Sequence, residues 1–310
     1  MRVAVTGVSG YLGRLIARSM DADPEVESIL GLDIVEPKTL PHKMAFQKTD
    51  VRDADFAGLF RGVDVVYHLA FIVEPPKMIS MAEIDEINIQ GSRRVFEGAI
   101  AAGVPKIVYS SSVAAYGAHA DNPVPLLEDS PLRPNSDWYY SRAKGAVEGF
   151  LDDLQGQNPA TVIIRFRPCM FLGPTISNSA RKALSGRVLL CIHEDTKIDL
   201  AWDEDIADAF HMALGYKSSD IFNLAGEGPL TTMEMGALIN KRVLVLKPWW
   251  LIPACRFAVK LGLVSRGQME WLQASLNYPL IVSAEKARKK LGWKPRFNAG
   301  QALVRFVKNN

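Results

Sequence analysis

The stretch that decides the fold is Val3-Ala4-Val5-Thr6-Gly7-Val8-Ser9-Gly10-Tyr11-Leu12-Gly13. It begins as a short apolar run suited to a buried parallel strand, and apolar side chains at helical spacing follow its last glycine. Glycines at such a junction permit unusual backbone angles and let a diphosphate approach the amides and the dipole of the helix. The stretch therefore predicts a nucleotide-binding turn, although an ordinary glycine turn can produce the same Gly-x-x-Gly-x-x-Gly spacing.

A second apolar run, residues 28–32, ends in Asp33, about twenty residues after the glycine turn. A carboxylate at this place can accept hydrogen bonds from the adenosine ribose and repels a 2′-phosphate, which predicts NAD as the cofactor. Arg14, beside the last glycine, keeps NADP open as the alternative. A solvated strand end is the alternative for Asp33.

Composition excludes several classes of protein. The 310 residues are 48% hydrophobic and 23% charged, enough to bury a full core in a soluble globular protein. The net charge of +2 comes from scattered basic residues that are matched by acids, so no nucleic-acid partner and no membrane span are expected, and the charge gives no reason to expect an anionic membrane surface. Cys169, Cys191 and Cys255 are widely spaced, as in reduced buried thiols. These thiols and the lack of an apolar leader predict a cytoplasmic location. No bound metal is expected.

Short apolar runs alternate with helical stretches, the pattern of a doubly wound parallel α/β sheet that is covered on both faces. The expected strands are residues 2–6, 28–33, 44–48, 63–69, 105–110, 160–166 and 219–224. We expect a cofactor-binding domain from residues 1–168 and 204–226, and a smaller α/β substrate-binding portion from residues 169–203 and 227–310.

Two of these strand ends carry further candidates. After the third strand, Asp50 and Val51 can contact the edge and face of an adenine, or else Asp50 caps a helix. After the fourth, Leu69 and Ala70 are apolar and leave room for a dinucleotide to cross the strand ends. His68 is expected to be a buried, hydrogen-bonded histidine, because no acid or nucleophile accompanies it at useful spacing.

The fifth strand runs into Ser110, Ser111 and Ser112 at the carboxyl end, where sheets of this type bind ligands. Tyr140 and Lys144, four residues apart, share one face of a helix. The ammonium group of Lys144 is expected to lower the pKa of the Tyr140 phenol from about 10, so that Tyr140 becomes an acid or base. Ser112 can donate a hydrogen bond to the same substrate oxygen while a hydride moves.

In this order the motifs resemble the extended short-chain dehydrogenase/reductase superfamily, in its NAD-dependent epimerase/dehydratase branch. The resemblance spans nearly the whole chain and also includes residues 68–70, 110–117, 167–168, 173–174, 205–207, 291–295, Asn88 and Asn223. It implies a Rossmann domain with NAD, and a catalytic triad of Ser112, Tyr140 and Lys144. Homodimers through the helices that bear Asn88 and Tyr140 are a further expectation from the resemblance.

The sites expected from these patterns and from the resemblance are as follows. The cofactor site comprises Gly7, Gly10, Tyr11, Leu12, Gly13, Asp33, Asp50, Val51, Leu69, Ala70, Asn88, Ser110, Tyr140, Lys144 and Pro168, and the substrate site comprises Ser112, Met170 and Phe171. For Asn88, a direct role and the capping of a neighbouring turn both stay open.

Three departures from the family pattern concern the substrate. Nucleotide-sugar members usually carry an asparagine where this chain has Met170, and a diphosphate-binding arginine where it has Ile198, beside Lys197. A lysine is only a point charge and does not replace a bidentate clamp, so nucleotide-sugar binding is expected to be weakened. Val113-Ala114 replaces the Asp-Glu pair of sugar dehydratases, which argues against dehydration.

Residues 243–264 are rich in apolar and aromatic side chains, but charged residues and prolines interrupt them, so they do not predict a membrane span. A core helix, a lid over an apolar substrate and a membrane-surface element remain open, and residues 269–276 can extend the same wall. His193-Glu194-Asp195 is expected to be a solvated loop, not a metal site.

The predicted function is the NAD-dependent oxidation of a secondary alcohol, or the reverse reduction, on a small-molecule substrate that is hydrophobic or modestly polar. The alternative is a nucleotide-sugar 4-epimerase that retains its NAD. A sensor without turnover is disfavoured by the intact Ser112, Tyr140 and Lys144.

Overall fold

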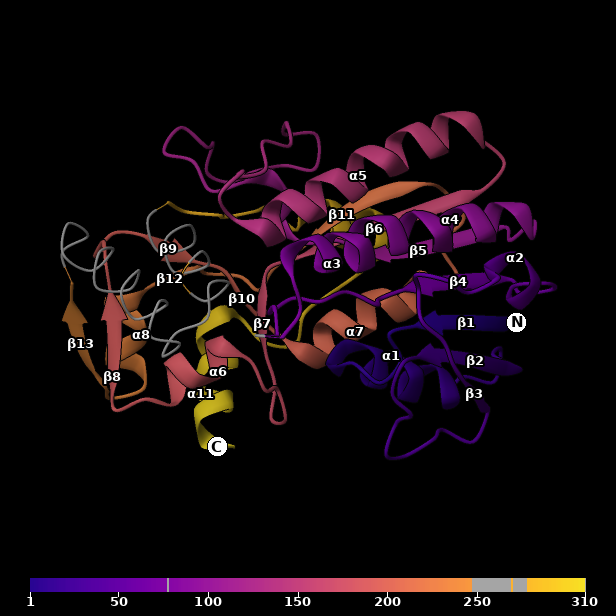
Figure 1. Ribbon diagram of the computed structural model, residues 1–310. Helices are drawn as coiled ribbons and strands as arrows, with labels where there is room; N and C mark the ends of the chain where they lie inside the picture. The colour runs from indigo at the N-terminus through magenta and orange to yellow at the C-terminus, as the bar shows by residue number, and fades with distance from the viewer. Residues whose placement is uncertain (77, 247–268, 270–277, 310) are drawn as a thin grey trace.

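The computed structural model describes residues 1–76, 78–246, 269 and 278–309, and a seven-stranded parallel sheet forms its centre (Figure 1). The order across the sheet is β11-β6-β5-β4-β1-β2-β3, so the direction of winding reverses between β1 and β4. The strands are β1 (Arg2–Thr6), β2 (Ser28–Asp33), β3 (Met44–Lys48), β4 (Val65–His68), β5 (Lys106–Ser110), β6 (Val162–Pro168) and β11 (Asp220–Leu224). All seven predicted strands are confirmed, with small differences at their ends.

Helices cover both faces of this sheet, as the doubly wound prediction requires. One face packs against α1 (Tyr11–Asp21) and α7 (Asp203–Met212). The opposite face packs against α2 (Phe56–Leu59), α4 (Gly91–Ala101) and α5 (Tyr139–Gln157). Neighbouring strand residues point to opposite faces: Val3 and Val5 contact the first layer, whereas Ala4 contacts the second.

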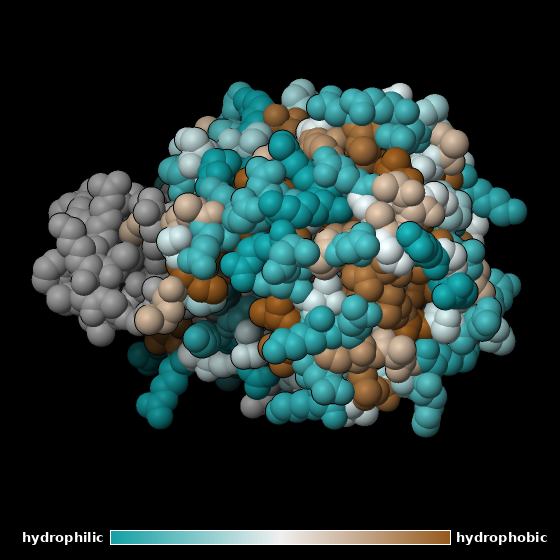
Figure 2. All heavy atoms as spheres, turned by 45° about the vertical axis from the view of Figure 1, so that its right-hand side comes forward, coloured by the Kyte–Doolittle hydropathy of each residue, from teal (hydrophilic) through white to brown (hydrophobic). Residues whose placement is uncertain are grey.

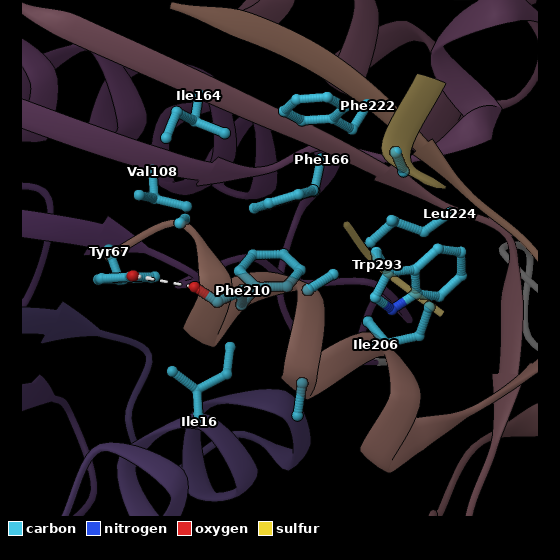
Figure 3. Packing of buried hydrophobic residues seen from close by; sticks show 14 of the residues in the cluster. Ile16, Tyr67, Val108, Ile164, Phe166, Ile206, Phe210, Phe222, Leu224 and Trp293 are labelled. Carbon is cyan, nitrogen blue, oxygen red and sulfur yellow. Dashed lines mark hydrogen bonds between the residues drawn. The ribbon is translucent and has the colours of Figure 1, made fainter. Parts of the chain in front are cut away.

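Figure 3 shows the layer between the sheet and helices α1 and α7. Phe166 of β6 lies over Phe210 of α7, with ring centroids 4.5 Å apart. The hydroxyl of Tyr67 in β4 donates a hydrogen bond to the backbone oxygen of Phe210 at 2.9 Å. Because the buried hydroxyl has this hydrogen-bond partner, its burial costs little free energy. The same bond fixes α7 to the middle of the sheet.

A smaller portion lies beside the sheet, to its left in Figure 1. Its strands form three two-stranded sheets, β7 with β10, β8 with β13, and β9 with β12. Its elements are β7 (Met170–Leu172), α6 (Ser179–Ser185), β8 (Val188–Cys191), β9 (Lys197–Ile198), β10 (Leu200–Trp202), β12 (Leu230–Thr231), α8 (Thr232–Leu238), β13 (Arg242–Val245) and α11 (Ala299–Lys308). A core of its own includes Leu172, Trp202, Met235 and Phe306.

Short elements complete the described chain. They are α3 (Met81–Asp85), the π-helical turn η1 (Glu86–Gln90), the 3₁₀ turn η2 (Val113–Tyr116) and the π-helical turn η3 (Ala287–Leu291). Turn η1 continues directly into α4, and η2 follows the serines at the end of β5.

Several further expectations concern the surface. The face in Figure 2 is largely hydrophilic, with hydrophobic areas between the polar side chains. Residues 193–195 are exposed, and no metal-binding cluster occurs among the described residues. Within the same residues no helix is both long and apolar enough to cross a bilayer. Cys169 and Cys191 are buried free thiols. Residues 243–245 of the apolar segment belong to strand β13 and are not helical, whereas Cys255, residues 247–264 and residues 270–276 lie outside the described residues.

Candidate active site

A cavity of about 530 Å³ opens where β1, β4, β5 and β6 end, at the reversal of winding. This volume is in the range of small-molecule and cofactor sites. It brings together most of the expected residues: Gly7, Gly10, Tyr11, Leu12, Gly13, Leu69, Ser110, Ser112, Tyr140, Lys144, Pro168, Met170 and Phe171 all line it. The expected residues therefore lie together at one edge of the sheet.

The glycine turn fits tightly between β1 and the chain that follows β4. Gly7 has a φ of +72°, and a Cβ atom there would lie 2.5 Å from the backbone nitrogen of Ala70. A Cβ atom on Gly13 would lie 2.2 Å from the backbone oxygen of Gly7. Helix α1 begins directly after Gly10, which offers its first amides no side-chain cap. The turn thus presents backbone amides and a helix N-terminus to the cavity, the features that bind a diphosphate.

Asp33 lies at the end of β2, beside this turn. Its carboxylate accepts hydrogen bonds from the backbone amides of Ser9 at 3.0 Å and Val35 at 3.2 Å. The side chain of Arg14 donates to the backbone oxygen of Ser9. Asp33 is half-buried, beside the glycine turn but outside the wall of the cavity.

The phenol of Tyr140 sits in the cavity wall at the start of α5. The hydroxyl of Ser112 belongs to the same wall and is close enough to lower the pKa of this phenol. Ser112 caps η2 by accepting a hydrogen bond from the amide of Ala114 at 3.1 Å, which fixes its position. Two hydroxyl groups from distant parts of the chain therefore meet at one place in the wall.

Lys144 follows one helical turn later and is buried. Its Nζ donates to the backbone oxygen of Ser110 at 2.7 Å and to the hydroxyl of Tyr109 at 3.3 Å. The same nitrogen lies 3.5 Å from the centroid of the Phe71 ring and 5.6 Å from that of Tyr140. Burial lowers the pKa of Lys144 well below its usual value, against the opposing charge of Glu148.

The expected effect of Lys144 on Tyr140 is wrong. Burial raises the pKa of Tyr140 to about 12, and the group that lowers it is the hydroxyl of Ser112. The reason is that the phenol is itself removed from water, which disfavours its charged form by more than the Ser112 hydroxyl offsets, and Lys144 is not among the groups that lower its pKa.

Four expected cofactor contacts lie outside the wall besides Asp33. Asp50 accepts a hydrogen bond from the amide of Arg52 at 3.0 Å and pairs with its guanidinium at 2.7 Å. Val51 is buried in the core beneath α2 and α4. The backbone of Ala70 packs on Gly7. Asn88 is fully buried, and its amide exchanges hydrogen bonds with the backbone of Ile72 at 2.8 and 3.0 Å, the turn-capping alternative.

His68 is the buried, hydrogen-bonded residue that the sequence predicted. Its ring nitrogens lie 2.7 Å from the hydroxyl of Thr6 and 2.8 Å from that of Ser92. Burial, followed by the charge of Lys144, lowers its pKa to about 3. The ring is therefore neutral at ordinary pH.

Sequence reasoning missed much of the apolar wall. Phe71, Trp138, Tyr139 and Leu280 line the cavity. The hydroxyl of Tyr139 donates to the backbone oxygens of Ile72 and Val73 and so holds the chain after β4 over Lys144. The run of three aromatic residues Trp138-Tyr139-Tyr140 at the start of α5 was a visible signal in the sequence. No such signal pointed to Leu280 in the sequence, because this residue comes from a distant loop.

One buried carboxylate in the wall, Asp199, was also missed. It lies between β9 and β10, next to Ile198. In the sequence Asp199 is a single acid between the apolar residues Ile198 and Leu200. This pattern does not distinguish a buried acid from one that is exposed on a strand.

The cavity fits a dinucleotide. The glycine turn offers uncapped amides for a diphosphate, and Leu69 and Pro168 leave an apolar passage across the strand ends. Lys144 stands beside Ser110 at the far end of this passage, where it can hold a ribose. NAD supplies the acceptor or donor of a hydride when bound.

Comparison with known proteins agrees with this geometry. The NAD dependent epimerase/dehydratase family matches residues 3–225. An uncharacterized protein of Mycobacterium tuberculosis is 24% identical over 312 residues, covering 97% of this chain and 82% of its own. UDP-glucose 4-epimerase of Mycolicibacterium smegmatis is 26% identical over 330 residues, covering 99% and 97%.

Among solved structures, MoeE5 in complex with UDP-glucuronic acid and NAD has the same fold, with a TM-score of 0.78 and 17% identity over 100% of this chain and 98% of its own. The chain therefore belongs to the NAD-dependent epimerase/dehydratase family and is an NAD-dependent enzyme of the short-chain dehydrogenase/reductase type.

Proposed function

We propose that this enzyme transfers a hydride between NAD and a secondary alcohol or ketone on an apolar or modestly polar substrate. The observation that carries the proposal is the position of the Ser112 and Tyr140 hydroxyls in a largely apolar cavity. Among the described residues of its wall, Lys144 and Lys197 are the only basic ones, and none is an arginine.

In the direction of oxidation, Tyr140 accepts the proton of the substrate hydroxyl while the hydride leaves the same carbon for the nicotinamide ring. Ser112 donates a hydrogen bond to the substrate oxygen and lowers the pKa of Tyr140, which eases the proton transfer. Lys144 holds the cofactor ribose against Tyr140. Ketone reduction uses the same groups in reverse, with Tyr140 as the acid.

Met170, Phe171 and Ile198 form the expected substrate wall. Burial of apolar surface there contributes about 25 cal/mol per Å². A diphosphate in the same place would lie against apolar side chains, and none of these three residues offers it a bidentate partner. This arrangement favours a substrate body without a diphosphate.

The second candidate is a nucleotide-sugar 4-epimerase, in which NAD stays bound and returns the hydride to the opposite face of the sugar. The UDP-glucose 4-epimerase among the relatives favours it. Lys197 and Asn178 at the cavity offer one cationic and one polar contact for a nucleotide. Met170 and Ile198, in place of polar and bidentate groups, count against it.

We further propose that residues 1–168 and 204–226 bind the cofactor, while residues 169–203 and 227–310 hold the substrate. The return of the chain through α7 to β11 supports this division. A cytoplasmic homodimer that pairs through η1, α4 and α5 is the associated proposal for location and assembly.

Absorbance at about 340 nm tests the function while the protein and NAD meet either hydrophobic secondary alcohols or UDP-sugars. A steady rise with an alcohol, absent in Tyr140→Phe and kept in Tyr216→Phe, is the expected result. Tyr216 is a suitable control because its hydroxyl binds Asp220, away from the cavity. A UDP-sugar converted to its epimer without a net rise would make the epimerase the correct function.

A further inference from the structure

Asp199 is a buried acid in the wall of the cavity that the proposed reaction does not use. It is 4% exposed and lies between β9 and β10. Strands β7 and β10 run parallel with Leu200 opposite Met170, so the residue before Leu200 lies level with Cys169. Cys169 lies in the chain between Pro168, an expected cofactor residue, and Met170, an expected substrate residue. Asp199 therefore lies near the boundary between the two expected sites.

Only half of this carboxylate has a partner among the described residues. Its Oδ2 accepts a hydrogen bond from the backbone amide of Val282 at 2.8 Å. The other oxygen, Oδ1, makes no hydrogen bond or ion pair to any described residue, and it is not sealed within the protein. A buried oxygen without a donor is costly, and here the opening onto the cavity is where a donor can arrive.

We propose that Asp199 is a specificity-determining residue that binds a hydrogen-bond donor, a hydroxyl or an ammonium group, on the otherwise apolar body of the substrate. The inference rests on the proposed function for the reacting end of the molecule. It adds the substrate class, which is an apolar secondary alcohol with a second donor group. Tyr140 takes the reacting oxygen, and Asp199 selects the second group.

The environment of Asp199 makes this recognition depend on pH. Burial raises the pKa of its carboxyl group to about 7. The titratable side chain beside it is the neutral thiol of Cys169, while Tyr11, Glu74, Tyr140, Lys144 and Lys197 belong to the same wall. Above this pH Asp199 is an anion and attracts an ammonium group. Below it the acid is neutral, and the attraction is lost.

Three cyclohexanols test the inference, with a methyl, hydroxymethyl or aminomethyl group on the carbon opposite the alcohol. Their binding to the NAD-saturated protein is measured by calorimetry at about pH 6 and about pH 8. At the higher pH the wild type is expected to bind the aminomethyl probe at least about tenfold more tightly than the methyl probe. This preference is expected to shrink at the lower pH.

Asp199→Asn is the decisive variant, because it removes the charge and keeps an oxygen for the amide of Val282. It is expected to abolish the preference and its pH dependence, while the methyl probe binds as before. Asp195→Asn removes an exposed acid from the preceding loop and is expected to behave as the wild type. The hydroxymethyl probe distinguishes a general preference for donors from one for cations only.

Equal binding of the three probes, binding of none, or a preference that survives in Asp199→Asn would overturn the inference. Absorbance of NADH in the same mixtures separates it from the proposed reaction. Donor-dependent binding without any NADH would leave Asp199 as the selecting residue and refute the oxidation. Turnover of the methyl probe without a donor preference would support the oxidation and refute the role of Asp199.

Discussion

At the scale of single residues, the proposed chemistry depends on how the Ser112 hydroxyl changes the pKa of Tyr140. Burial raises the pKa of Tyr140 to about 12, and the hydroxyl of Ser112 opposes this rise. In the proposed alcohol oxidation Tyr140 acts as a base, so the rate should increase with pH toward that value. Ketone reduction needs the protonated phenol, which predominates at neutral pH.

Replacing Ser112 by alanine removes the group that lowers the pKa of Tyr140. In Ser112→Ala we expect the rise of kcat/KM with pH, measured for alcohol oxidation, to move to higher pH. At neutral pH kcat/KM should fall by about 10²–10⁴-fold. The measurement is kcat/KM against pH in both directions. Ser177→Ala, which removes another hydroxyl from the cavity wall, serves as the control. An unshifted limb in Ser112→Ala would assign the pH dependence to another group.

At the scale of elements, the glycine turn shows why a sequence pattern becomes a binding site. Gly7 and Gly103 both have a φ of +72°, but only Gly7 meets neighbouring atoms, the backbone of Leu69 and Ala70. Gly103→Ala thus isolates the strain of the left-handed conformation, and Gly7→Ala adds a collision with main chain.

We expect Gly7→Ala to weaken NAD binding by more than about tenfold, because the turn must shift away from Ala70 and its amides leave their positions. Gly103→Ala should bind NAD as the wild type does, with some loss of stability. Equilibrium titration of NAD against each purified variant measures both effects. Equal loss in the two variants would mean that strain, not the close approach, controls the turn.

Helix α5 carries Tyr140 and Lys144, and a buried ionic cluster holds its next turn. Glu148 is fully buried and binds Arg165 at 3.0 Å and Arg167 at 2.8 Å, both from β6. Burial raises the pKa of Glu148, but the hydrogen bond and charge of Arg167 lower it overall. The carboxylate is therefore ionised and fixes the helix against the sheet.

Glu148→Ala leaves two buried guanidinium groups without their shared partner, which should cost about 3–5 kcal/mol in the free energy of unfolding. Urea unfolding of the purified protein measures this change. Glu285→Ala removes an exposed acid paired with Lys289 on the surface and should leave stability unchanged. A loss in Glu148→Ala as small as that of Glu285→Ala would show that the cluster does not stabilise the helix.

How much the sequence could predict differs between these elements. The seven strands and the turn depend on local patterns, continuous apolar runs and glycine spacing, and the structure confirms the strands. The pKa of Tyr140 was predicted in the wrong direction, because the burial of its phenol, beside the ring of Phe71, depends on a loop that no spacing reveals. Asp199 was missed for the same reason, since its partner Val282 lies 83 positions away in the chain.

At the scale of the whole molecule, specific hydrogen bonds join the seven-stranded sheet and its helices to the rest of the chain. The hydroxyl of Tyr11, in the first turn of α1, donates to Asp203 at the start of α7. The indole of Trp293 donates to the backbone oxygen of Asp205 at 2.7 Å, and Arg296 binds the carboxylate of Asp205 at 2.7 Å. The C-terminal segment is thus tied to the helix that covers the sheet.

Because these contacts are buried or half-buried, we expect the two portions to unfold together. Urea unfolding followed by far-ultraviolet circular dichroism and by tryptophan fluorescence should give coincident transitions. NAD at 100 times its dissociation constant should raise the free energy of unfolding by about 2.7 kcal/mol, and both transitions should move to higher urea concentration. Two separate transitions, of which NAD moves only one, would mean that the portions fold independently. The shared cavity would then be assembled only when they dock, and the bonds of Tyr11, Trp293 and Arg296 would be too weak to couple them.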